Sequence, residues 1–230
     1  MTILLYTLVG LCVVFSLVTA YVRNRRMLRA RFVCKMTASL LFLGTGLTAA
    51  SLRGDMTIPV ALLLGALLLG FVGDIILGLD YFVRKDLQSF LFLLGGAPFF
   101  FGHVLYTYIF LTAAPLRRQL LPLLLLIPLT FVALDATKRW HLGKNTAPLL
   151  LYGLVLSAMV VGTLNLALGG GSLGKLMAVP GVLFAFSDTC LFLRRFGSAE
   201  VKRRAPLFSY LVLFPYYTAQ ALFALSVQYL

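Results

Sequence analysis

Asp74 and Asp188 are the residues of this sequence best placed to do chemistry, because each interrupts a long apolar stretch. The sequence around them reads FVGDIIL over 71–77 and AFSDTCL over 185–191. An aspartate at the centre of a lipid-spanning helix costs roughly 2.5–3.5 kcal/mol, so it persists only where it is paired, hydrated or functional. Two buried carboxylates can supply one neutral acid as a proton donor and one anion, since burial and mutual repulsion disfavour ionisation of both.

Seven further polar residues lie within apolar stretches and are candidates to bind a substrate beside the two acids. They are Lys35, His103, Tyr106, Tyr152, Ser187, Tyr217 and Gln220. Helical spacing puts His103 on one face with Tyr106, and Tyr217 on one face with Gln220. Structural roles are the alternatives: Lys35 could form a salt bridge with an acid or extend to the membrane surface, and His103 could make an interhelical hydrogen bond.

The composition predicts an integral membrane protein with an all-α fold. Of 230 residues, 61% are hydrophobic and only 12% are charged, which is more apolar surface than a soluble domain of this length could bury. The charges fall in short clusters between apolar runs that are long enough to cross a bilayer as helices, which takes about 20 residues. We therefore predict a bundle of eight transmembrane helices, near residues 2–22, 33–52, 57–80, 87–113, 118–138, 147–168, 175–195 and 206–229.

Topology explains the net charge of +13 without invoking nucleic acid. With eight spans, fifteen of the 20 Lys and Arg residues fall in loops on one side of the membrane, four fall on the other side, and Lys35 lies within the second span. Because basic loops stay in the cytoplasm, both termini are predicted on the non-cytoplasmic side. The basic loops would also contact anionic headgroups, so membrane lipid is an expected partner and nucleic acid is not.

Small residues beside each acid predict that both acids face other helices, since small residues let helix backbones approach closely. The small residues that share a helix face with Asp74 or Asp188 are Ala66, Gly70, Gly78, Ala178, Gly181 and Ala185. Both spans run toward the cytoplasm, which puts the two acids at the same depth, about 9 Å from the inner end at 1.5 Å per residue. The sequence thus predicts a polar cavity in the inner half of the bundle.

The few cysteines and histidines argue against a metal site or a disulfide framework. Cys12, Cys34 and Cys190 lie in or beside spans, with no spacing typical of thiol ligands or paired cysteines. With only His103 and His141, the chain cannot build a three-histidine zinc centre. Neither a metal nor another cofactor is expected.

Short loops between the predicted spans indicate that residues 1–230 form a single membrane domain. A shift of 114 positions carries Asp74 onto Asp188, His103 onto Tyr217 and Tyr106 onto Gln220. A weak parallel repeat of residues 1–114 and 115–230, as found in some transporters, would explain this relation.

Several of these segments together resemble the YhhN-like family of lysoplasmalogenases. The matching motifs run in order from about residue 33 to the end, and Lys35 and the pattern Pro148, Tyr152, Met159 also fit. The four longest motifs are GDIIL at 73–77, FGHVLY at 101–106, FSDTCL at 186–191 and YYTAQ at 216–220. The sequence departs from the family at Met36, where proline is usual, and at Asp80, where an acid is not typical.

The resemblance implies a multi-pass, cofactor-independent hydrolase of lysoplasmalogens. Such an enzyme cleaves the vinyl-ether bond and releases a fatty aldehyde with glycerophosphoethanolamine or glycerophosphocholine. Vinyl-ether hydrolysis requires a proton donor and an anion, and glycosidases solve a related oxocarbenium problem with two carboxylates. Asp74 and Asp188 would therefore form the acid and base pair. The other polar residues would orient water and the ether oxygen, and Lys35 with the inner-side arginines would hold the phosphate.

Two other functions fit the same features. Buried acids, eight spans and a possible repeat also occur in proton-coupled transporters and lipid translocators, which need a sealed membrane and a gradient to act. A lipid-binding scaffold without chemistry would tolerate replacement of both acids. The short loops and the lack of retention signals favour a bacterial plasma membrane, whereas a eukaryotic protein of this kind would be expected in the endoplasmic reticulum.

Overall fold

The computed structural model describes residues 2–79, 82–84, 87–140 and 143–230. Asp80 and His141, both considered above, lie outside these residues. The described chain is 88% helical, and three short 3-10 segments join or extend the α-helices. The helices are α1 (Thr2–Asn24), α2 (Leu28–Arg53), α3 (Ile58–Leu79), α4 (Gln88–Thr112), η1 (Arg118–Leu125), α5 (Leu126–Ala136), η2 (Gly143–Asn145), α6 (Thr146–Gly169), α7 (Gly171–Met177), α8 (Pro180–Phe196), α9 (Ala199–Arg203), α10 (Ala205–Ser226) and η3 (Val227–Tyr229).

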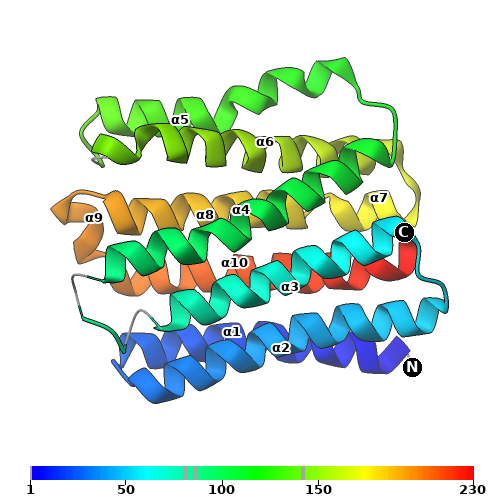
Figure 1. The fold of residues 1–230 in the computed structure, drawn as a ribbon, viewed down its shortest axis with the longest axis horizontal. Coiled ribbons are helices and arrows are strands. Elements are labelled where there is room, and N and C mark those ends of the chain that lie inside the picture. The colour runs from blue at the N-terminus through cyan, green and yellow to red at the C-terminus, as the bar shows by residue number, and fades with distance from the viewer. Residues whose placement is uncertain (1, 80–81, 85–86, 141–142) are drawn as a thin grey trace.

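Eight segments of the described chain are long and apolar enough to cross a membrane, which confirms the predicted all-α bundle. Five of them are the single helices α1, α2, α3, α4 and α6. The other three combine neighbouring elements, η1 with α5, α7 with α8, and α10 with η3. Both termini lie at the same end of the bundle (Figure 1). The side of the membrane that this end faces stays a prediction.

Helix α10 is the central element of the bundle. It packs against α1, α2 and α8, and its span is the most buried of the eight. The span made of η1 and α5 is the least buried and lies at the edge, against α6 (Figure 1). Because α10 touches both sides of the bundle, its side chains can connect the helices that carry the two acids.

The seventh span is broken, which the apolar run at 175–195 did not predict. Helix α7 ends at Met177 and α8 begins at Pro180. Proline lacks the N–H that would continue the helical hydrogen bonds, but it suits the first turn of a new helix. Before α7, Gly170 and Gly171 turn the chain with φ values of +76° and +74°, which side-chain-bearing residues rarely adopt.

Helices α4 and α6 approach each other most closely toward their C-terminal ends. A Cβ atom placed on Gly162 of α6 would lie 2.9 Å from the Cβ atom of Phe110 in α4, so only glycine permits this approach. One turn earlier in α4, Thr107 Oγ1 donates a hydrogen bond to the Val155 carbonyl at 3.4 Å. Helix α4 runs obliquely across the bundle (Figure 1), so its N-terminal half diverges from α6.

Replacing Gly162 with alanine tests this close contact. The new methyl group would meet Phe110, so we expect the variant to lose about 1–3 kcal/mol of unfolding free energy in detergent. Gly10→Ala is the matched control, because a Cβ there meets nothing within 4 Å, and it should not lower stability. Equal stability of the two variants would contradict the proposed contact.

Candidate active site

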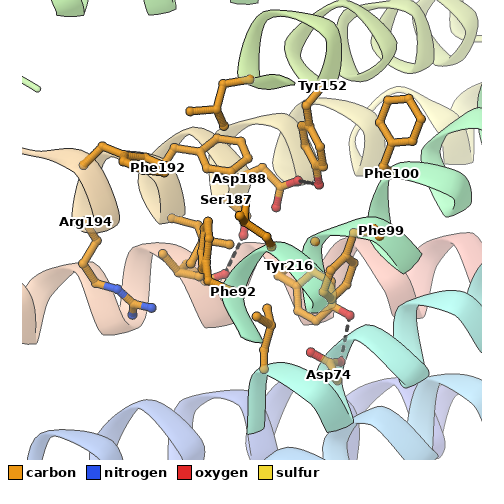
Figure 2. A pocket seen from close by; sticks show the side chains of 18 of the residues that line it. Asp74, Phe92, Phe99, Phe100, Tyr152, Ser187, Asp188, Phe192, Arg194 and Tyr216 are labelled. Atoms are coloured by element: carbon orange, nitrogen blue, oxygen red, sulfur yellow. Dashed lines mark hydrogen bonds between the residues drawn. The ribbon is translucent and has the colours of Figure 1, made fainter. Parts of the chain in front are cut away.

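Asp74 and Asp188 line one cavity of about 410 Å³, in the half of the bundle away from the termini. Asp74 belongs to α3 and Asp188 to α8, and the two residues are 2% and 4% exposed, respectively. Figure 2 shows them on different walls of the cavity, Asp74 beside Tyr216 and Asp188 beside Tyr152. The expectation that both acids face other helices and share a cavity agrees with this geometry.

Asp74 accepts three hydrogen bonds from side chains, one of them from a buried cation. The Lys35 ammonium lies 2.6 Å from Oδ1, and it also donates to the Asp74 backbone carbonyl at 2.9 Å. The second carboxylate oxygen, Oδ2, accepts from the hydroxyls of Ser39 and Tyr216, both at 2.7 Å. A buried carboxylate with one cation and two hydroxyl donors is stabilised as the anion. Lys35 is therefore a counter-ion and does not extend to the membrane surface.

Asp188 has a different set of partners, all of them uncharged or weakly basic. Its Oδ2 accepts from the Tyr152 hydroxyl at 2.6 Å and lies 3.2 Å from His103 Nε2. His103 Nε2 is also 3.0 Å from the Tyr152 oxygen. Since the tyrosine proton points to Asp188, the tyrosine oxygen must accept, which assigns the proton of His103 to Nε2. Both contacts are made to Oδ2, and none of the described residues forms a hydrogen bond with Oδ1.

The two acids therefore differ in charge balance. Asp74 forms an ion pair with Lys35, whereas among the described residues Asp188 pairs only with His103, whose imidazole need not be charged. A carboxyl group beside an ammonium group has a Coulombic partner that one beside a neutral imidazole lacks. The site thus contains one ion-paired carboxylate and one acid whose Oδ1 is left over for other partners among the described residues.

Five of the nine sequence-predicted site residues line the cavity, and four lie behind its wall. The lining residues are Asp74, Asp188, Lys35, Tyr152 and Ser187, and the residues behind them are His103, Tyr106, Tyr217 and Gln220. Ser187 lines the cavity but its hydroxyl donates to the Val212 backbone carbonyl at 2.8 Å.

The residues behind the wall support those that line it. Tyr106 donates to Gln220 at 2.8 Å, and Gln220 in turn donates to the Tyr216 oxygen at 3.4 Å. The Tyr217 hydroxyl donates to the Lys35 carbonyl at 3.2 Å and lies 3.1 Å from the Ser39 hydroxyl. These contacts of Tyr106, Gln220 and Tyr217 fix side chains that touch Asp74, so the three residues position the site from outside the cavity. His103 does the same for Asp188 and Tyr152.

Ser39 and Tyr216 bond Asp74 directly, although the sequence did not single them out as site residues. Two signals could have identified them. Ser39 follows Lys35 by four positions, and Tyr216 precedes Gln220 by four, so each shares a helix face with a predicted site residue.

One wall of the cavity is strongly basic. Three arginines line it together with Lys35, and they come from the last turn of α1, the first turn of α2 and the last turn of α8: Arg23, Arg31 and Arg194. The rest of the lining is mostly aliphatic and aromatic. The cavity thus combines cations, two acids and an apolar surface, as a site for an amphipathic anion requires.

Replacing Lys35 with methionine tests the ion pair. The change leaves the Asp74 carboxylate buried without its cation, so we expect a loss of about 3–5 kcal/mol in unfolding free energy. The double variant with Asp74→Asn removes the uncompensated charge and should recover part of that loss. Unfolding in detergent measures both, and a double variant no more stable than the single variant would contradict the pairing.

Comparison with known proteins identifies the family of the chain. Neither a curated protein nor a solved structure matches it. The model of the YhhN family matches residues 30–227, a stretch that contains both acids and each described residue bonded to their carboxylates. The chain belongs to the YhhN family.

Proposed function

We propose that this protein is a lysoplasmalogenase-type hydrolase, which cleaves the vinyl-ether bond of lysoplasmalogens within the membrane. The observation that carries the proposal is the unequal pair of acids in one cavity, an ion-paired Asp74 and an Asp188 bonded only through Oδ2. Membership of the YhhN family, which includes lysoplasmalogenases, supports the same activity. The membrane we propose is a bacterial plasma membrane, since the loops are short.

The reaction consumes one water and needs no redox step. A proton adds to the β-carbon of the vinyl ether, and the α-carbon becomes an oxocarbenium ion. Water attacks that carbon and loses a proton, which gives a hemiacetal. The hemiacetal hydroxyl then loses its proton as the bond to the glycerol oxygen breaks, and the glycerol oxygen takes up a proton. The products are a fatty aldehyde and glycerophosphoethanolamine or glycerophosphocholine.

Asp188 is our candidate for the proton donor. In the neutral form its proton sits on Oδ1, because Oδ2 already accepts from Tyr152 and faces His103 Nε2. After transfer, the same two groups stabilise the new carboxylate by hydrogen bonding. Tyr152 and His103 therefore act on the rate through the stability of the Asp188 anion.

Asp74 is our candidate for the anion that stabilises the oxocarbenium ion and accepts the proton from water. A carboxylate offers about four acceptor positions, and Lys35, Ser39 and Tyr216 occupy three of them. The remaining position can bind a water molecule in the cavity. The division of roles follows from the partners, since Lys35 forms an ion pair with Asp74 whereas Asp188 has no such cation among the described residues.

The basic wall is our candidate for the phosphate site. The sequence predicted phosphate binding by Lys35 together with the inner-side arginines. Because Lys35 is already bonded to Asp74, we assign phosphate binding to the arginines of this wall alone. Guanidinium groups match the geometry of phosphate oxygens and remain charged in a partly apolar site. A phosphodiester held there would place the adjoining glycerol and ether beside the two acids.

Aldehyde release by the purified protein in detergent tests the proposed activity. A hydrolase works without a gradient, whereas a transporter would give no product under these conditions. In deuterated water the aldehyde should carry one deuterium at carbon 2, because that carbon receives the proton. In oxygen-18 water the glycerophospho product should stay unlabelled. Label in that product, or no aldehyde at all, would refute the mechanism or the activity, respectively.

Asp188→Asn tests the proton donor. Loss of the donor should lower kcat by about 10²–10⁴-fold, the usual contribution of general acid catalysis. Asp55→Asn is a matched control. Asp55 forms an exposed ion pair with Arg53, with 2.6 Å between Oδ1 and Nε, and neither residue lines the cavity, so the activity of this variant should be unchanged. Full turnover by the Asp188 variant would contradict the assignment of Asp188 as the proton donor.

A further inference from the structure

The cavity reaches the outer surface of the bundle between α4 and α6. Three of its lining side chains are also exposed on the face of these helices, Leu93 at 54%, Phe101 at 57% and Leu151 at 55%. In a membrane-spanning bundle, such apolar side chains on the outer surface face hydrocarbon. The cavity therefore opens toward the lipid chains through a gap between these two helices, which we call the α4–α6 opening.

The crossing of α4 and α6 explains why the gap occurs there. The helices are held together at Gly162 and Phe110 and diverge toward their N-terminal ends (Figure 1). The lining residues of the opening all lie in the diverging parts, Leu93–Phe101 of α4 and Pro148–Tyr152 of α6. Gly96 leaves further room, because a Cβ atom placed there meets nothing within 4 Å.

The opening and two arginines of the basic wall, those from α1 and α2, lie on opposite sides of the acids. Arg23 and Arg31 belong to α1 and α2, the helices that also place Lys35 beside Asp74. Asp188 instead contacts α6 and α4, through Tyr152 and His103. Starting from Arg23 and Arg31, the order across the cavity is therefore cations, Asp74, Asp188 and the apolar opening. This order matches an amphipathic molecule with an anionic head and one hydrocarbon tail.

The cavity volume argues that part of the tail stays outside. About 410 Å³ lies near the lower end of the range of roughly 300–1,000 Å³ for pockets that enclose small molecules. A long-chain lysolipid therefore does not need to be enclosed completely. Its headgroup and ether can occupy the cavity while the chain passes through the α4–α6 opening into the bilayer.

We infer that a single-chain lysophospholipid reaches the acids sideways from the bilayer, through the α4–α6 opening, and keeps its hydrocarbon chain in that opening while bound. The identity of the lipid rests on the proposed function, but the path rests on the shape of the cavity. An ester lysophosphatidylcholine with a photoreactive diazirine in the half of its chain nearer the glycerol can therefore map the path without any hydrolysis.

Illumination of the purified protein with this probe should label peptides that contain Leu93–Phe101 or Pro148–Leu151. An excess of unlabelled lysophosphatidylcholine should compete the labelling away. Label that concentrates on α1, α2 or α10, or label that does not compete, would overturn the inferred path.

Gly96→Phe is the variant designed to close the opening. The ring would occupy open space, so we expect the protein to fold and the labelling of α4 and α6 to fall by about tenfold, as expected if about two methylene groups are displaced. Gly10→Phe is the control, since position 10 is exposed on α1, away from the cavity, and has equally open surroundings. Unchanged labelling in the Gly96 variant would contradict the path.

The path and the proposed function can fail separately. Competed labelling at α4 and α6 in a protein that releases no aldehyde would leave the path intact and refute the hydrolase. Aldehyde release with labelling elsewhere would leave the hydrolase intact and refute the path.

Discussion

The buried ion pair between Lys35 and Asp74 is the interaction on which the rest of the site depends. A charge in an apolar bundle is tolerated only with a partner, and here the partner comes from a different helix at 2.6 Å. Ser39 and Tyr216 complete the shell of Asp74, so one carboxylate ties together α2, α3 and α10. Since these helices also form a wall of the cavity, the ion pair fixes both its shape and the charge on that side.

The pair also decides what Asp188 can do. Lys35 is the one lysine among the described residues that line the cavity, and it is committed to Asp74, so the second acid is left with Tyr152 and His103. Enzymes that use two acids commonly place them in unlike surroundings, so that one is ionised and the other carries the proton. Here the distinction arises from where one cation lies. Under the proposed mechanism, the division of roles between the two acids would follow from the packing of α2 on α3.

The sequence predicted the eight spans, because long apolar runs separated by clustered charges indicate membrane-spanning helices. It also predicted the inward direction of both acids, because small residues at helical spacing indicate a face that packs against other helices. It did not predict the break between α7 and α8, where Pro180 acts within an apolar run. It also left open which acid would take Lys35, and placed Tyr106 in contact with substrate instead of with Gln220. Such pairings depend on how helices far apart in the chain rotate against one another, which spacing within one helix cannot reveal. The predicted repeat stays a prediction.

The central position of α10 has a consequence for how the protein is made. It is synthesised after the seven other spans, yet Tyr216 bonds Asp74 and the α10 backbone accepts from Ser187 beside Asp188. While the ribosome is still translating this helix, the earlier spans are already in the bilayer without it. Neither acid then has its full surroundings. Completion of the cavity around the two acids is therefore a late step in biogenesis, and a nascent chain that lacks α10 would not yet have the activity we propose.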